Sequence, residues 1–168
     1  MLIAVQLEDI DNLDVGEQGF TETDKKNPKI ANDTILIDNI LNIRILANDG
    51  EQQKALDLCN ETIEKNKLDK GLYFLRASIL QELGRDTEAI GSLKQVIYLD
   101  QNCIMGHFSL GNLYVQEGRQ VLAKKYFNAA LYLLREKPDD EILSESEGLS
   151  VKYMREIISS SINKFTIR

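Results

Sequence analysis

Glycines at a fixed spacing constrain this chain more than any other feature of its sequence. Gly50, Gly84 and Gly118 lie 34 residues apart, and an alanine follows each of them by five residues. Glycine takes a positive φ angle without strain, so it can end one helix and turn the chain into the next. The period predicts a row of helical hairpins, which stack because one hairpin alone cannot bury its apolar face.

The residues around Gly84 show the helical spacing most clearly. Apolar residues recur at steps of three and four on both sides of this glycine, which favours amphipathic helices over strands. They are Leu72, Leu75, Ile79, Leu80 and Leu83 before it, and Ala89, Ile90, Leu93, Val96 and Ile97 after it. The sequence therefore predicts an all-α fold.

The third unit of the period resembles the tetratricopeptide repeat, whose pattern is Trp-x-x-Leu-Gly-x-x-Tyr followed by Ala-x-x-x-Phe. The matching residues are Leu110, Gly111 and Tyr114, then Ala123 and Phe127, while His107 takes the place of the first aromatic residue. The second unit fits more loosely, and the first departs from the pattern at Asn39, Asn42 and Ile43. This resemblance implies a tetratricopeptide-type α-solenoid of about three helix pairs with a C-terminal capping helix.

Charge and apolar spacing divide the chain into four parts. Acidic residues dominate both the start of the chain and the segment after Pro138, whereas Ser150 is a good N-cap for a last amphipathic helix. We predict a weakly structured acidic arm (1–34), three repeats in 35–137 (36–69, 70–103 and 104–137), a solvated acidic connector (138–149) and a capping helix (150–166).

The composition excludes several classes of function. The chain of 168 residues has a formal net charge of −7, which opposes binding to a phosphate backbone. One histidine and two widely separated cysteines, which we interpret as buried thiols, provide no metal site or redox motif. No apolar run is long enough to cross a membrane, and the start does not resemble a secretory signal. We therefore expect a cytoplasmic protein without cofactor or metal that does not bind nucleic acid and does not insert into a membrane.

Four stretches resemble one more specific family, the tetratricopeptide region that follows the catalytic domain in some CheR-type chemotaxis receptor methyltransferases. The stretches are YFLRASILQELGR (73–85), AIGSLKQVIYLDQN (89–102), HFSLGNLYVQEGR (107–119) and SESEGLSVKYMREII (144–158). The acidic Ser-Glu-Gly-Leu segment before the last helix is the most particular of them. The resemblance extends over about residues 35–162.

In that family an α/β domain that binds S-adenosylmethionine precedes the repeats. The short segment before the repeats cannot hold such a domain, and no Gly-x-Gly-x-x-Gly loop follows a strand pattern, so no catalytic residue is carried over. We expect these 168 residues to be a protein-interaction module, not an enzyme, with a protein or peptide partner that the resemblance places in a chemotaxis system. The alternatives are part of a split or truncated methyltransferase, or a general scaffold unrelated to chemotaxis.

The predicted binding site is the concave face of the solenoid, formed by the first helix of each pair. Equivalent positions in the three units hold Ile40, Phe74 and Phe108, which predicts an apolar stripe. The full set is Ile37, Ile40, Arg44 and Asn48 from the first unit, Phe74, Ser78, Gln81 and Glu82 from the second, and Met105, Phe108, Asn112 and Gln116 from the third.

This face admits three interpretations. It is a groove for an apolar or amphipathic segment, or a clamp for a C-terminal carboxylate, or its phenylalanines only pack between helices or under the terminal helix. Asn112 has no lysine neighbour on the face, which disfavours the clamp. His107 and Cys59 occupy packing positions of their repeats, and Asp139 and Asp140 lie in the predicted connector, so we assign none of them to catalysis.

Overall fold

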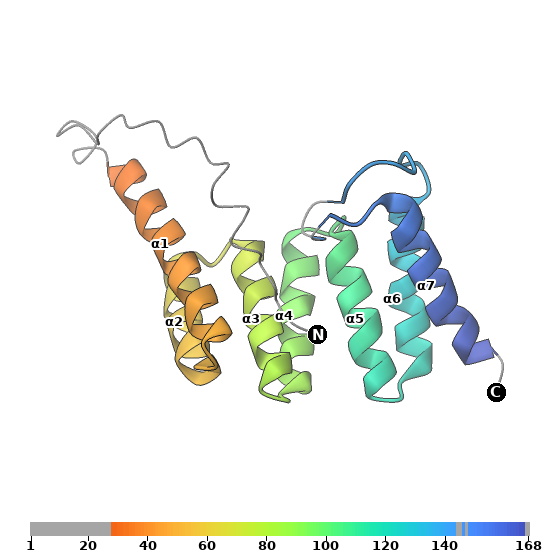
Figure 1. Cartoon of the computed structure of the whole chain (residues 1–168), viewed down its shortest axis with the longest axis horizontal. Coiled ribbons are helices and arrows are strands. Elements are labelled where there is room, and N and C mark those ends of the chain that lie inside the picture. The colour runs from red at the N-terminus through yellow and green to blue at the C-terminus, as the bar shows by residue number, and fades with distance from the viewer. Residues whose placement is uncertain (1–27, 144–145, 147, 167–168) are drawn as a thin grey trace. The chain divides into compact units, whose positions relative to one another are not determined.

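The structure is a computed structural model that describes residues 28–143, 146 and 148–166. Within these residues the fold is all-α, with seven helices, no strand and one isolated β-bridge between Ile142 and Ser150 (Figure 1). The fold class predicted from the sequence is therefore confirmed. The chain divides within α2, between Thr62 and Ile63, into two compact units that we describe separately.

The helices follow one another with short connections. Their bounds are α1 (Pro28–Asn48), α2 (Gln52–Lys65), α3 (Lys70–Glu82), α4 (Asp86–Leu99), α5 (Ile104–Gln116), α6 (Gln120–Leu134) and α7 (Val151–Thr166). Of the segment 1–34 that the sequence assigns to a weakly structured arm, the last part is helical, because α1 begins at Pro28. Proline suits the first position of a helix, since its φ angle is already helical and its missing N–H has no partner there. Residues 1–27 of the predicted arm lie outside the described residues.

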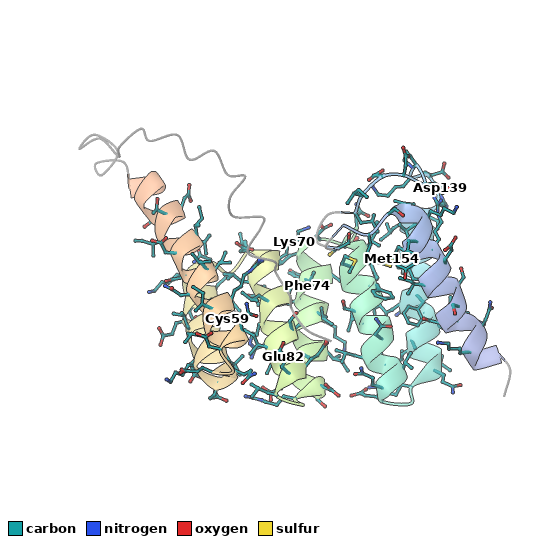
Figure 2. The ribbon with its side chains drawn as sticks, in the orientation of Figure 1. Cys59, Lys70, Phe74, Glu82, Asp139 and Met154 are labelled. Carbon is teal, nitrogen blue, oxygen red and sulfur yellow. The ribbon has the colours of Figure 1, made fainter. Side chains whose placement is uncertain are left out.

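In the first unit, α1 and α2 provide the buried side chains. Ile43 and Ala47 are buried on α1, and Ala55, Leu56 and Cys59 are buried on α2 (Figure 2 labels Cys59). Cys59 is fully buried and Cys103 of the second unit is nearly so, as the sequence predicts. The packing interpretation of Cys59 agrees with this burial.

The three periodic glycines occupy equivalent turns. Gly50, Gly84 and Gly118 have φ angles of 81°, 69° and 71°. After Gly84, the backbone N–H of Arg85 donates to the carbonyl of Leu80 at 2.8 Å. The same bond joins Glu51 to Leu46 at 2.9 Å and Arg119 to Tyr114 at 2.8 Å. These turns are Schellman motifs, in which a left-handed residue lets the chain satisfy the last carbonyls of a helix.

We expect Gly118→Ala to lower the free energy of unfolding by about 1 kcal/mol, because an L-residue is strained at this φ angle. A Cβ atom on Gly118 would meet no atom within 4 Å, so the backbone alone accounts for the loss. Urea unfolding followed by circular dichroism measures it. Gly118→Asn should cost less, since asparagine tolerates the left-handed region; an equal loss for both variants would contradict this explanation.

The second unit is a stack in which consecutive helices pack on one another. Contacts join α3 to α4, α4 to α5, α5 to α6 and α6 to α7 (Figure 1). The helices of the pair α5–α6 approach closely at Gly111, where an added Cβ atom would lie 2.4 Å from Cε1 of Phe127. Phe127 is fully buried, so this small residue makes room for a core ring.

The segment between α6 and α7 is held by specific hydrogen bonds. The buried hydroxyl of Ser146 donates to the carbonyl of Leu143 at 2.5 Å and accepts from the N–H of Leu149 at 3.0 Å. The N–H of Leu143 in turn donates to the carbonyl of Leu149 at 3.0 Å, and Gly148 turns the chain with a φ angle of 89°. The sequence predicts a solvated connector here, and Asp139 and Asp140 are indeed exposed. Leu143 and Ser146 are buried, however, and Ser146 and Leu149 have a structural role through these hydrogen bonds.

Arg155 joins α7 to the end of α6. Its guanidinium donates to the carbonyls of Leu134 at 2.5 Å and Lys137 at 2.8 Å, and it forms an ion pair with Asp139 (Figure 2 labels Asp139). Asp139 is therefore a structural partner, not only part of a solvated charge run. Ser150 caps α7 as predicted, because its hydroxyl accepts from the N–H of Tyr153 at 3.3 Å.

Candidate partner-binding surfaces

The predicted binding residues of the first unit lie along α1. Ile37 has 65% of its surface exposed, Ile40 is half-buried, and Arg44 and Asn48 are exposed. Large apolar side chains at this degree of exposure are available to a partner. These four residues form one part of the prediction, and the second unit holds the rest.

In the second unit, the predicted residues lie on α3 and α5. Phe74 and Phe108, at equivalent positions of the period, are both half-buried (Figure 2 shows Phe74 on α3). The ring of Phe108 also packs on Phe127, with 6.0 Å between ring centroids, so it belongs partly to the core. The remaining residues divide by exposure: Ser78, Met105 and Asn112 are half-buried, and Gln81, Glu82 and Gln116 are exposed.

A small pocket of about 220 Å³ adjoins Met105. Leu143 from the folded loop also lines it, which places that loop beside the start of α5. Two lysines border the pocket, and both are paired: Lys70 with Asp100 at 2.7 Å, and Lys137 with Glu141.

The pairing at this pocket has an electrostatic consequence. The hydrogen bond from Lys70 holds the pKa of Asp100 below its ordinary value. A carboxylate ligand at either lysine would therefore compete with a carboxylate of the chain itself. This arrangement agrees with the low rank that the sequence gives to a carboxylate clamp.

A larger pocket of about 470 Å³ lies among α4, α5 and α6. Lys94 and Tyr98 line it from α4, His107 and Leu110 from α5, and Tyr126 from α6. Tyr98 has 77% of its surface exposed. The predicted site residues do not include any of these side chains, so sequence reasoning missed this surface.

His107 and Tyr73 make the same contact in successive repeats. Nε2 of His107 lies 3.0 Å from the carbonyl oxygen of Gln101, and the hydroxyl of Tyr73 donates to the carbonyl of Lys67 at 3.2 Å. Each pair bridges the turn that precedes its helix, which supports the structural interpretation of His107. Nδ1 of His107 is buried without a hydrogen-bond partner within the described part of the chain.

The described residues include no group of three or more His, Cys, Asp or Glu side chains that could hold a metal ion. Among the helices of that part, none combines the length and the apolar character needed to cross a bilayer.

Comparison with known families identifies the helix pairs of the second unit. Residues 71–103 and 106–135 each match the tetratricopeptide repeat. The chain contains tetratricopeptide repeats. The matches cover the pairs α3–α4 and α5–α6, while the predicted first repeat, 36–69, lies outside them and stays a prediction.

Two curated relatives match part of the chain. The protein named DnaJ homolog subfamily C member 7, from Homo sapiens, is 32% identical over 80 residues, which are 48% of this chain and 15% of that protein. Its counterpart from Mus musculus matches equally. The chain thus spans about a seventh of the length of these curated relatives, as expected when a repeat recurs in larger proteins.

Several solved structures share the fold. SycD from Yersinia enterocolitica, described as a type III secretion translocator chaperone, has a TM-score of 0.66 at 18% identity and covers 81% of this chain and 92% of its own. PcrH, solved in complex with the chaperone binding region of PopD, has a TM-score of 0.66 at 15% identity and covers 80% of this chain and 92% of its own. MamA has a TM-score of 0.53 at 25% identity and covers 55% of this chain and 54% of its own. At these identities SycD and PcrH establish the tetratricopeptide-type fold and no partner for this chain.

Proposed function

We propose that this chain is a protein-interaction scaffold that binds a segment of a partner protein along the face predicted from the sequence. Phe74 and Phe108 carry the proposal, because the period repeats a half-exposed aromatic residue on α3 and on α5. Buried aromatic anchors typically contribute most of the binding energy at such surfaces. Polar neighbours such as Ser78 and Asn112 supply hydrogen bonds that fix the bound segment.

Two structural neighbours support this type of function. PcrH was solved with the chaperone binding region of PopD, and SycD was solved with a peptide of the translocator YopD. Both have the fold of this chain, and tetratricopeptide arrays in general present an extended surface to partner segments. The partner of this chain is a protein segment with large apolar side chains, which suit the two phenylalanines.

The finer proposal is a regulatory role like that of the repeats in a chemotaxis receptor methyltransferase. Its support is the sequence SESEGLSVKYMREII, in which Ser146 bonds to the carbonyl of Leu143 and Val151 begins α7. A general scaffold of tetratricopeptide repeats does not need this loop after its last pair. The partner would then be a component of a chemotaxis system, including a separate methyltransferase.

We expect the double variant Phe74→Ala and Phe108→Ala to weaken partner binding by about 2 kcal/mol or more, a factor of at least about thirty in Kd. Affinity capture from native cytosol identifies the partner, and isothermal titration calorimetry then gives the Kd. Tyr153→Ala, which replaces an exposed tyrosine on α7, is the control and should leave the Kd unchanged. Unchanged binding by the folded double variant would reject this face as the site.

A separate titration tests the methyltransferase alternative. Heat released when S-adenosylmethionine is added to the purified chain would indicate a cofactor site and contradict the scaffold function. The expected result is no heat at about millimolar cofactor, a concentration that reveals even weak sites.

A further inference from the structure

The pocket among α4, α5 and α6 arises from a difference between two successive helix pairs. In the pair α3–α4, the guanidinium of Arg76 donates to the hydroxyl of Ser92 at 2.8 Å. The positions 34 residues later, in the pair α5–α6, hold Leu110 and Tyr126. A polar contact in one repeat is thus replaced by an apolar and an aromatic side chain in the next, and both of these line the pocket.

The aromatic wall of this pocket consists of packed rings with two lysines nearby. Tyr126 stacks on Tyr114, with 5.5 Å between ring centroids, and its ring lies 6.0 Å from that of His107. The ammonium of Lys125 lies 5.6 Å from the centroid of Tyr126. Lys94 lines the same pocket from α4, with its side chain exposed.

The pocket lies in a part of the chain that is poor in acidic residues. Neither α5 nor α6 contains an aspartate or glutamate, and α4 has none after Glu88. Asp100, which follows α4 and interacts electrostatically with His107, is already paired with Lys70 at 2.7 Å. Lys94 and Lys125 thus contrast with the net charge of −7 of the whole chain. A surface with cations at its rim and an apolar floor is complementary to an acidic segment that carries a large apolar side chain.

We propose that this pocket is a second docking site, which binds an acidic segment of a partner protein. A large apolar side chain of that segment packs against Ile97 and Tyr126, which line the pocket and are both half-buried, and its carboxylates pair with Lys94 and Lys125. The buried Nδ1 of His107, which the described part of the chain leaves without a hydrogen bond, lies in the pocket wall. A volume of about 470 Å³ accommodates one or two side chains of such a segment.

This site is distinct from the face of Phe74 and Phe108. Phe108 and Leu110 are two residues apart on α5, so their side chains point about 200° apart around the helix axis. The two surfaces can therefore be occupied or altered independently, and the failure of one proposal leaves the other standing.

A labelled peptide tests the proposal on the full chain. The probe is a capped hexapeptide, Glu-Asp-Phe-Leu-Glu-Glu, and the control replaces its four acids with lysine. We expect saturable binding of the acidic probe by fluorescence anisotropy, weaker binding at higher salt, and amide shifts in NMR spectra that centre on α4, α5 and α6. No saturable binding up to about 1 mM, equal binding of the lysine peptide, or shifts centred on Phe74 would overturn the proposal.

Two variants locate the site. Lys94→Glu, on an exposed side chain, should weaken binding of the acidic probe by about tenfold or more, because it reverses a rim charge. Tyr126→Ser removes the half-buried aromatic wall, with the residue found at the equivalent position of the preceding pair, and should weaken binding by about tenfold or more. The double variant Phe74→Ala with Phe108→Ala should bind the probe like the unaltered chain. Undiminished binding by Lys94→Glu would overturn the assignment.

Discussion

Replacing Gly111 with alanine should lower the free energy of unfolding by about 2 kcal/mol, although alanine is the better helix former. The added Cβ atom would lie 2.4 Å from Cε1 and 2.5 Å from Cδ1 of Phe127, closer than a Cβ atom approaches another carbon atom in a folded protein. Phe127 is fully buried, so its ring cannot turn toward solvent and the helices α5 and α6 must separate. Urea unfolding followed by circular dichroism measures the loss.

Gly91 provides a matched control on α4. It is an exposed helical glycine, and a Cβ atom there would meet nothing within 4 Å. Gly91→Ala should therefore raise the free energy of unfolding by about 0.5–1 kcal/mol, since alanine restricts the unfolded chain. If both variants were stabilising, the close packing of Gly111 on Phe127 would be refuted. Phe127→Leu in the Gly111→Ala background should recover part of the loss, because the smaller side chain relieves the overlap.

Replacing Arg155 with methionine should cost about 2 kcal/mol. Methionine keeps much of the length and apolar character of the side chain, but it removes the donors to the carbonyls of Leu134 and Lys137 and the ion pair with Asp139. These carbonyls lie at and just after the end of α6, where the helix itself provides few donors. The carbonyl of Leu134 also accepts from the N–H of Lys137 at 3.1 Å, so Arg155 adds a second donor there. Hydrogen exchange of the α7 amides should accelerate more than that of α3, because α7 packs on α6 at the end of the stack.

Two further substitutions test whether the hydrogen bonds of the Arg155 guanidinium, and not its charge alone, stabilise the protein. Arg155→Lys keeps the positive charge without the planar fork, so an intermediate loss is expected. Arg119→Met removes an exposed arginine that pairs with Glu117 at 3.3 Å, and it should cost less than about 1 kcal/mol. A loss at Arg119 as large as that at Arg155 would show that the backbone contacts are not the source of the stability.

The helix pairs were predictable because their cause is local and repeats. A glycine with a positive φ angle recurs at Gly50, Gly84 and Gly118. The spacing of the apolar residues on either side of each glycine predicts which of them are buried. The start of α1 was not predicted. Sparse apolar residues before Ile35 give no amphipathic signal, whereas Pro28 begins the helix through its backbone geometry.

The loop before α7 was beyond prediction for a different reason. Ser146 and Arg155 act by donating to backbone carbonyls, and a carbonyl looks the same whatever residue carries it, so the sequence shows no matching partner. The residue types alone indicated an acidic, solvated segment. Only the path of the chain brings Arg155 to the end of α6.

The predicted binding residues followed directly from the repeat register, because equivalent positions place Phe74 and Phe108 on equivalent helices. The pocket among α4, α5 and α6 was overlooked, although one comparison along the sequence would have revealed it. The register that aligns Phe74 with Phe108 also aligns Arg76 with Leu110 and Ser92 with Tyr126. A change from a polar pair to an apolar one within a regular array marks a surface that differs between repeats.

The position of Arg155 sets the length of the repeat array. At the end of α4, the chain passes from Asp100 to Cys103, whose sulfur caps the next helix by accepting from the N–H of Gly106 at 3.3 Å. At the end of α6, the guanidinium of Arg155 instead donates to the carbonyls of Leu134 and Lys137, and the chain continues into the loop. A further hairpin grafted after Leu134 would have to displace this side chain before it could dock. The terminal helix therefore prevents a further helix pair from docking on α6. Additional repeats engineered into the protein should be inserted before α5 and not after α6.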